Sequence, residues 1–224
     1  MTKDEAARRL DDVRGRIAGA ARTAGRKADD VALIAISKTQ PAGAVAALIA
    51  AGQRLFGENR VQEAQDKWPA LREAHPDIGL HLVGQLQSNK ADAAVRLFDA
   101  IHSLDRPSLV TALARAMDAT GRRPQLFIQV NIGAEPQKGG CAIAGLPALL
   151  ADARGADLPV AGLMCVPPAG VEAAPYFALL GKLARDHGLP LLSMGMSDDY
   201  PTAVTLGATH VRVGSALFGA RQQG

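Results

Sequence analysis

A lysine, an arginine and two glycine-rich segments are the residues of this 224-residue chain that could perform chemistry together. Lys38 directly follows the apolar run 31–37 (VALIAIS), which is typical of a buried strand. A lysine at the end of such a strand is partly removed from water. Partial desolvation favours the neutral amine, which can form an imine with an aldehyde. The alternative is an ordinary surface lysine at the start of a loop.

The two glycine-rich segments lie late in the chain. The first contains Ser193, Met196 and Ser197 and comes at the end of an apolar run. The second contains Gly214 and Ser215 and ends the last apolar run. Glycine allows a ligand to approach the backbone closely, and N–H groups at the start of a helix bind anions. Together the segments indicate a phosphate site, although each one alone could be a tight turn.

Arg212 lies between Val211 and Val213 in the last apolar run. Because side chains alternate along a strand, two valines that face outer helices place Arg212 on the opposite, interior side. A buried arginine needs polar partners or a ligand, so Arg212 is either salt-bridged in the core or part of a binding site. An imine-forming lysine, a phosphate cradle and an interior arginine together describe a site for pyridoxal phosphate.

The elements that must position these residues alternate between strand-like and helical patterns. Apolar residues at helical spacing first predict an N-terminal helix over about residues 3–24. Eight strand-like runs follow, separated by helical stripes, at 31–37, 54–57, 80–84, 100–104, 125–131, 160–166, 191–195 and 210–214. Alternating strands and helices indicate a parallel sheet.

Eight such units predict one α/β domain, a (β/α)8 TIM barrel over about residues 31–221 with an extra N-terminal helix. An open doubly wound sheet is the alternative. In a TIM barrel the functional groups follow the C-terminal ends of the strands, and phosphate is commonly bound after strands seven and eight. The lysine and the glycine-rich segments occupy these positions.

The composition excludes several classes of protein. Apolar residues make up 48% and charged residues 21% of the chain, as in ordinary soluble domains. A net charge of +3 is too small to indicate nucleic acid as a partner. No apolar stretch is long enough for a membrane helix, and the charged N-terminus does not resemble a signal peptide, so we expect a cytoplasmic protein. The two cysteines form no metal-ligand motif, and we expect neither a metal nor a disulfide.

Nearly the whole chain also resembles the pyridoxal phosphate homeostasis protein family, whose fold is similar to the N-terminal barrel domain of alanine racemases. The resemblance covers roughly residues 31–221. It is carried by many ordered motifs: 35–39 (AISKT), 56–63 (FGENRVQE), 81–90 (HLVGQLQSNK), 102–106 (HSLDR), 129–140 (QVNIGAEPQKGG), 162–168 (GLMCVPP), 192–199 (LSMGMSDD) and 209–221 (THVRVGSALFGAR).

The resemblance implies a role for each matching position. Lys38 matches the lysine that holds pyridoxal phosphate as an internal aldimine, and Arg212 matches the arginine that faces the pyridine nitrogen. The groups around the phosphate match Ser197, Gly214 and Ser215, with Met196 contributing backbone. The remaining predicted cofactor-binding positions are Asn59, His81, Met164 and Ser193.

A protein that binds pyridoxal phosphate can be either a carrier or an enzyme. A guanidinium opposite the pyridine nitrogen disfavours its protonation and weakens the cofactor as an electron sink. A racemase also needs a second base, a tyrosine from an additional domain in the racemase family, whereas this chain has only Tyr176 and Tyr200.

We therefore expect no catalytic residues and a non-enzymatic, monomeric carrier. It would supply pyridoxal phosphate to apo-enzymes and, as the resemblance implies, influence amino-acid and keto-acid balance. The alternatives are a low-activity amino-acid racemase with the same cofactor and, from the residue pattern alone, a Schiff-base aldolase that uses Lys38 without one.

Overall fold

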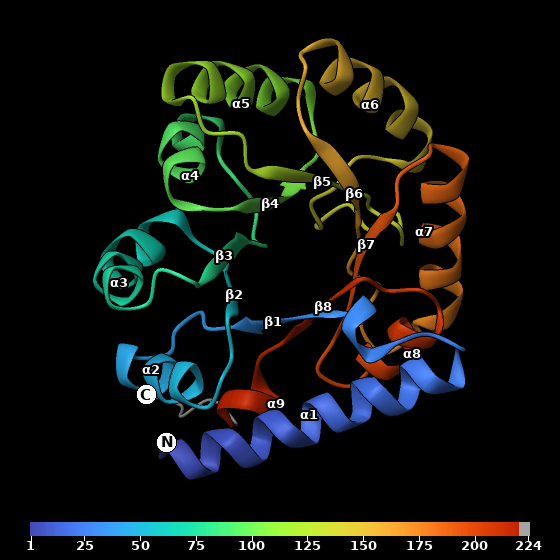
Figure 1. The fold of residues 1–224 in the computed structure, drawn as a ribbon. Coiled ribbons are helices and arrows are strands. Elements are labelled where there is room, and N and C mark those ends of the chain that lie inside the picture. The colour runs from blue at the N-terminus through green and yellow to red at the C-terminus, as the bar shows by residue number, and fades with distance from the viewer. Residues whose placement is uncertain (220–224) are drawn as a thin grey trace.

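The computed structural model describes residues 1–219, and the predicted end of the barrel at 221 lies outside this range. Eight parallel strands close into a barrel in which each strand pairs with the next and β8 pairs with β1 (Figure 1). The strands are β1 Ala32–Ile36, β2 Leu55–Glu58, β3 Gly79–Leu82, β4 Ala100–Leu104, β5 Gln125–Gln129, β6 Val160–Met164, β7 Leu191–Met196 and β8 His210–Val213. The predicted (β/α)8 barrel is confirmed.

Helices surround the barrel and cover its outer face (Figure 1). They are α1 Lys3–Thr23, α2 Ala42–Ala50, α3 Val61–Ala74, α4 Ala91–Leu97, α5 Pro107–Thr120, α6 Leu146–Gly155, α7 Ala174–Asp186, α8 Tyr200–Thr205 and α9 Ser215–Phe218. Short 3-10 turns occupy Ala28–Asp30, Ser88–Lys90 and Ile143–Gly145. The main core lies between the sheet and these helices.

The N-terminal helix α1 lies against α8, α9 and α2 (Figure 1). Its buried face consists of the apolar residues that recur at helical spacing: Ala6, Leu10, Val13, Ile17 and Ala21. The side chain of Thr2 caps the helix by accepting a hydrogen bond from the Glu5 N–H at 3.2 Å. Burial of this stripe therefore attaches α1 to the outside of the barrel.

Strand β7 differs from its prediction. The predicted run covers residues 191–195, whereas β7 continues to Met196 and so includes most of the glycine-rich segment 193–197. Ser193 can stay within the strand because its hydroxyl is hydrogen-bonded inside the barrel to Arg212 and His102. Gly195 has φ +91°, and a Cβ there would lie 2.5 Å from the Cβ of Ala203. The glycine thus allows the end of β7 to pack closely against α8.

Candidate functional site

A cavity of about 390 Å³ opens at the C-terminal ends of the strands. This volume lies within the range of about 300–1,000 Å³ that is usual for small-ligand sites. Its walls come from the ends of β1, β2, β3, β6, β7 and β8 and from the loops that follow them. The lining residues are Ile36, Lys38, Thr39, Gln40, Asn59, Val83, Val166, Met196, Ser197, Asp198, Asp199, Arg212, Gly214, Ser215 and Gly219.

Most of the predicted cofactor-binding residues meet in this cavity. Those that line it are Lys38, Asn59, Met196, Ser197, Arg212, Gly214 and Ser215. They come from segments up to 177 positions apart in the chain (38 to 215), and the closed barrel brings them to one mouth. Sequence analysis missed several other polar lining residues, namely Thr39, Gln40, Asp198 and Asp199.

Two serine hydroxyls lie together on the side of the cavity formed after β7 and β8. The Ser215 hydroxyl donates a hydrogen bond to the Ser197 hydroxyl oxygen at 3.1 Å. Ser215 is the first residue of α9, where the initial N–H groups have no acceptor within the helix. Hydroxyl and backbone donors in one place make this side suitable for an anion such as a phosphate group.

Arg212 lies at the base of the cavity and is buried, with 4% of its surface exposed. Its guanidinium donates to the Ser193 hydroxyl oxygen at 2.7 Å and to the Cys165 carbonyl oxygen at 2.8 Å. Burial lowers the pKa of Arg212 from its ordinary value, but a guanidinium in a protein keeps its proton. The predicted interior orientation is confirmed, and the side chain is held by neutral oxygen atoms rather than by a carboxylate.

A chain of buried polar groups continues from Arg212 into the barrel. His102 Nδ1 lies 2.8 Å from the Ser193 hydroxyl oxygen, and His102 Nε2 lies 3.0 Å from His81 Nδ1. The guanidinium can only donate, so the Ser193 oxygen accepts from Arg212 and the hydroxyl hydrogen is available for His102 Nδ1. In the tautomer that carries its hydrogen on Nε2, His102 accepts from Ser193 and donates to His81.

All three histidines in the barrel interior are held in the neutral form. Burial, followed by the neighbouring charge of His210, lowers the pKa of His81 to about 3. Burial also lowers the pKa of His102 well below its ordinary value. The pKa of His210 falls to about 4 through burial and then through the charge of Arg212. These rings serve as hydrogen-bonding groups rather than as positive charges.

Three of the predicted cofactor-binding residues lie beneath the cavity and do not line it. His81 and Ser193 belong to the polar chain below Arg212. Met164 is 1% exposed and packs with Ala100 and Phe127 in the barrel interior. Direct contact of these side chains with a ligand stays a prediction, and the described geometry gives each of them a role in packing or in supporting Arg212.

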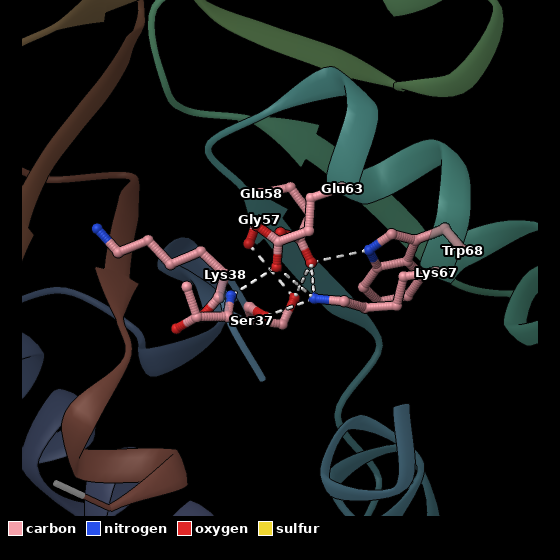
Figure 2. Close-up of polar contacts among 8 residues, drawn as sticks. Ser37, Lys38, Gly57, Glu58, Glu63, Lys67 and Trp68 are labelled. Atoms are coloured by element: carbon pink, nitrogen blue, oxygen red, sulfur yellow. Dashed lines mark hydrogen bonds and ion pairs between the residues drawn. The ribbon is translucent and has the colours of Figure 1, made fainter. Parts of the chain in front are cut away.

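Lys38 follows β1, and its neighbours in the chain are fixed from α3. Figure 2 shows the Lys38 side chain extending away from a cluster of hydrogen bonds formed by Ser37, Glu58, Glu63 and Lys67 with other residues. Sequence analysis did not identify this cluster. A signal was present, because Glu58 ends an apolar run where a buried charge needs a partner.

Neither tyrosine lies in the cavity. Tyr200 is fully buried at the start of α8, and its ring lies under the Arg16 guanidinium of α1, 5.0 Å from ring centroid to Cζ. Tyr176 lies on α7 and packs against the core. The described lining of the cavity thus contains no tyrosine that could act as a second base.

Metal ligands, disulfides and membrane helices can each be examined over residues 1–219. Within this range no group of three or more His, Cys, Asp or Glu side chains could hold a metal ion. Both cysteines are free thiols, and burial raises the pKa of Cys165 to about 12 and that of Cys141 to about 11. No helix in this part of the chain is long and apolar enough to cross a membrane.

A comparison with protein families matches residues 9–222 to the family described as alanine racemase, N-terminal domain. The chain belongs to this family. A relative from Pseudomonas aeruginosa, named pyridoxal phosphate homeostasis protein, is 43% identical over 218 residues and spans 95% of this chain and 94% of that protein. A protein of the same name from Escherichia coli is 39% identical over 230 residues, covering 97% of each chain.

A solved structure agrees with both the fold and the family. PipY of Synechococcus elongatus with pyridoxal phosphate bound has a TM-score of 0.83 and 41% identity, covering 96% of this chain and 100% of that one. The resemblance predicted from the motifs is therefore confirmed, and the chain spans almost the full length of relatives named for pyridoxal phosphate homeostasis.

Proposed function

We propose that this chain is a non-enzymatic carrier that binds pyridoxal 5'-phosphate in intracellular homeostasis of that cofactor. The observation that carries the proposal is the meeting of Lys38, the hydroxyls of Ser197 and Ser215, and Arg212 in one cavity. Relatives named pyridoxal phosphate homeostasis protein at 39–43% identity support it. So does PipY, whose structure contains the bound cofactor.

The donor groups of the cavity fit the chemistry of this ligand. The Lys38 amine would condense with the ligand's aldehyde carbon, forming an imine and releasing one water molecule. The hydroxyls of Ser197 and Ser215 and the backbone at Gly214 would hold the phosphate. Arg212, at the base of the cavity, would face the pyridine nitrogen.

A carrier is favoured over a racemase because the described lining of the cavity does not provide two features that such catalysis would use: a protonated ring nitrogen and a second base. When bound, pyridoxal phosphate supplies an electron sink, and this sink works best with a protonated ring nitrogen. Arg212 is held by two neutral oxygen atoms and brings a fixed positive charge, which disfavours that protonation. A racemase needs a base on each face of its substrate, and Tyr200 packs against α1 instead of facing the cavity.

The chain would act as a monomer in the cytoplasm, and apo-enzymes that need pyridoxal phosphate would be its recipients. Holding the aldehyde as an imine would keep the concentration of free aldehyde low. Hydrolysis of the imine would restore the Lys38 amine and release the ligand.

The mass of the intact protein after borohydride reduction tests the proposal. Wild-type protein incubated with pyridoxal phosphate should gain one reduced pyridoxyl phosphate group that maps to Lys38, and Lys38→Ala should gain none. Lys90→Ala is the matched control, because this exposed lysine lies in another connection from a strand to the following helix but does not line the cavity. An adduct that persists in Lys38→Ala, or is absent from the wild type, would exclude the proposed site.

An amino-acid panel separates carrier from racemase. The loaded wild-type protein should preserve the enantiomeric purity of each amino acid, while an apo-enzyme mixed with it should gain activity. Racemisation that depends on Lys38 would instead make the protein an enzyme.

A further inference from the structure

The backbone on both sides of Lys38 is held by α3, a helix that lies outside the cavity. The Lys67 ammonium donates to the Ser37 carbonyl oxygen at 2.8 Å, which belongs to the peptide group that joins Ser37 to Lys38. On the other side, the Thr39 N–H donates to Glu63 Oε1 at 2.5 Å. Two residues of one helix thus fix the peptide before and the peptide after the proposed imine-forming residue.

Lys67 and Glu63 are themselves held in place. The three hydrogens of the Lys67 ammonium reach three acceptors: the Ser37 carbonyl, Glu58 Oε1 at 3.0 Å and Glu63 Oε1 at 2.9 Å. The Lys67 side chain is only 10% exposed. Water therefore competes little for these donors, and the ammonium has no spare hydrogen with which to adopt another arrangement.

Glu58 is the anchor of this cluster and is fully buried at the end of β2. Besides Lys67, its Oε1 accepts hydrogen bonds from the Ser37 hydroxyl at 2.8 Å and from Trp68 Nε1 at 3.0 Å. The Trp68 ring packs on Phe56, with centroids 5.1 Å apart. The cluster consequently connects the end of β1, the end of β2 and α3 through buried contacts.

The segment that the cluster holds has a conformation that needs support. Thr39 has φ +61°, in the left-handed region that β-branched residues avoid. The Gln40 N–H donates to the Ser37 carbonyl at 3.1 Å, which closes a tight turn with Lys38 and Thr39 at its centre. In Figure 2 the Lys38 side chain leaves this turn on the side away from the cluster. The turn thereby sets the direction in which the Lys38 side chain leaves the backbone.

We infer that Glu63 and Lys67 are positioning residues for Lys38, and that they matter for covalent capture of the aldehyde rather than for binding of the phosphate. This inference rests on the proposed function. Neither residue lines the cavity, so neither would touch the ligand. Their effect would be to keep the amine in one geometry relative to an aldehyde that the phosphate contacts hold in place.

Glu63 offers the cleaner test, because its side chain is 27% exposed and its removal leaves Glu58 paired with Lys67. Glu63→Ala removes the acceptor of the Thr39 N–H, whereas Glu63→Gln keeps an oxygen at that position. Glu73→Ala is the matched control, since Glu73 is an exposed acid of the same helix. Two ligands are compared: pyridoxal phosphate, and pyridoxine 5'-phosphate, which has the same phosphate but no aldehyde.

The rate of imine formation at saturating pyridoxal phosphate, followed by absorbance, should fall about 10- to 100-fold in Glu63→Ala. It should recover largely in Glu63→Gln and stay unchanged in Glu73→Ala. The affinity for pyridoxine 5'-phosphate should be the same in all four proteins. A slower imine formation with an unchanged affinity for pyridoxine 5'-phosphate would not result from a general loss of structure.

Two results would overturn the inference. One is a folded Glu63→Ala protein that forms the imine as fast as the wild type, with Lys67→Met doing the same. The other is an equal loss of affinity for both ligands in these variants, which would mean that Glu63 and Lys67 maintain the shape of the whole cavity rather than the position of Lys38. If the wild-type protein forms no imine at Lys38 while pyridoxine 5'-phosphate still binds, the proposed function fails first and this inference fails with it.

Discussion

Replacing Lys67 by methionine should destabilise the protein strongly, because it leaves a buried carboxylate without its cation. The Glu58 side chain is 0% exposed and the Lys67 side chain 10% exposed, so solvent screens this pair little. Removing one partner of a buried ion pair costs about 3–5 kcal/mol. Glu58 keeps its hydrogen bonds from Ser37 and Trp68, which places the expected loss near the lower end, at about 3 kcal/mol.

Urea unfolding of the ligand-free protein measures this loss. With a slope of about 1–3 kcal/mol per molar urea, the midpoint should fall by about 1 M or more. A domain with about 5–15 kcal/mol of stability would remain folded. Arg96→Met is the control, because the Arg96–Asp92 pair on α4 is about 60% exposed and its loss should leave the midpoint nearly unchanged.

The double variant Glu58→Gln/Lys67→Met distinguishes the loss of the pair from the loss of the lysine side chain. Removing both charges leaves no uncompensated buried ion, so the double variant should be no less stable than Lys67→Met alone. Coupling between groups in contact is typically about 0.5–3 kcal/mol. Two results would refute the reasoning that Glu58 is buried as an ion. One is a loss of stability in the double variant equal to the sum of the losses in Glu58→Gln and Lys67→Met. The other is a loss below about 1 kcal/mol in Lys67→Met.

Three further predictions follow from the site. The folded-state pKa values of His81 and His210, about 3 and 4, lie below their ordinary value of 6.5, so their contribution to stability is complete above pH 6.5 and is lost as the pH falls. As the pH falls from 6.5 to 4, each of the two histidines should lower the free energy of unfolding by about 1.4 kcal/mol per pH unit. Urea unfolding across that range measures the loss. Ser197→Ala and Ser215→Ala should each weaken pyridoxine 5'-phosphate binding about 10-fold in calorimetry, without changing the unfolding midpoint. Tyr200→Phe should leave the rate of imine formation unchanged, and a large decrease would place that hydroxyl in the site after all.

The barrel was predictable because its strands are buried on both faces. Such strands appear in a sequence as short apolar runs, and the helices between them appear as stripes at helical spacing. The end of a strand was harder to place where polar residues continue it into the interior. Ser193 reads as a turn residue, yet it stays in β7 because Arg212 and His102 satisfy its hydroxyl, and both come from other strands.

The site was predictable to the extent that single positions carried a signal. Lys38 and Arg212 could be identified because a charged residue at the end of, or within, an apolar strand needs an explanation. The cluster around Glu58 was harder to identify: Glu58 itself ends an apolar run and carried a signal, but nothing in the sequence shows which residues of α3 are its partners. Glu63 and Lys67 read as an ordinary pair on an exposed helix face, and only the packing of α3 against the ends of β1 and β2 places them beside the Ser37 carbonyl and the Thr39 N–H.

The buried polar chain below Arg212 bears on the charge that a ligand in the cavity would meet. With the His102 hydrogen on Nε2, the hydrogen bonds below Arg212 run in one direction, from the guanidinium through Ser193 and His102 to His81. A proton added to His102 Nδ1 would remove the acceptor of the Ser193 hydroxyl and place a second positive charge in the barrel interior. Its lowered pKa reflects that burial and the charges of its neighbours. Among the described residues, Arg212 therefore stays the permanent positive charge at the base of the cavity, and the neutral histidines orient it without adding to that charge.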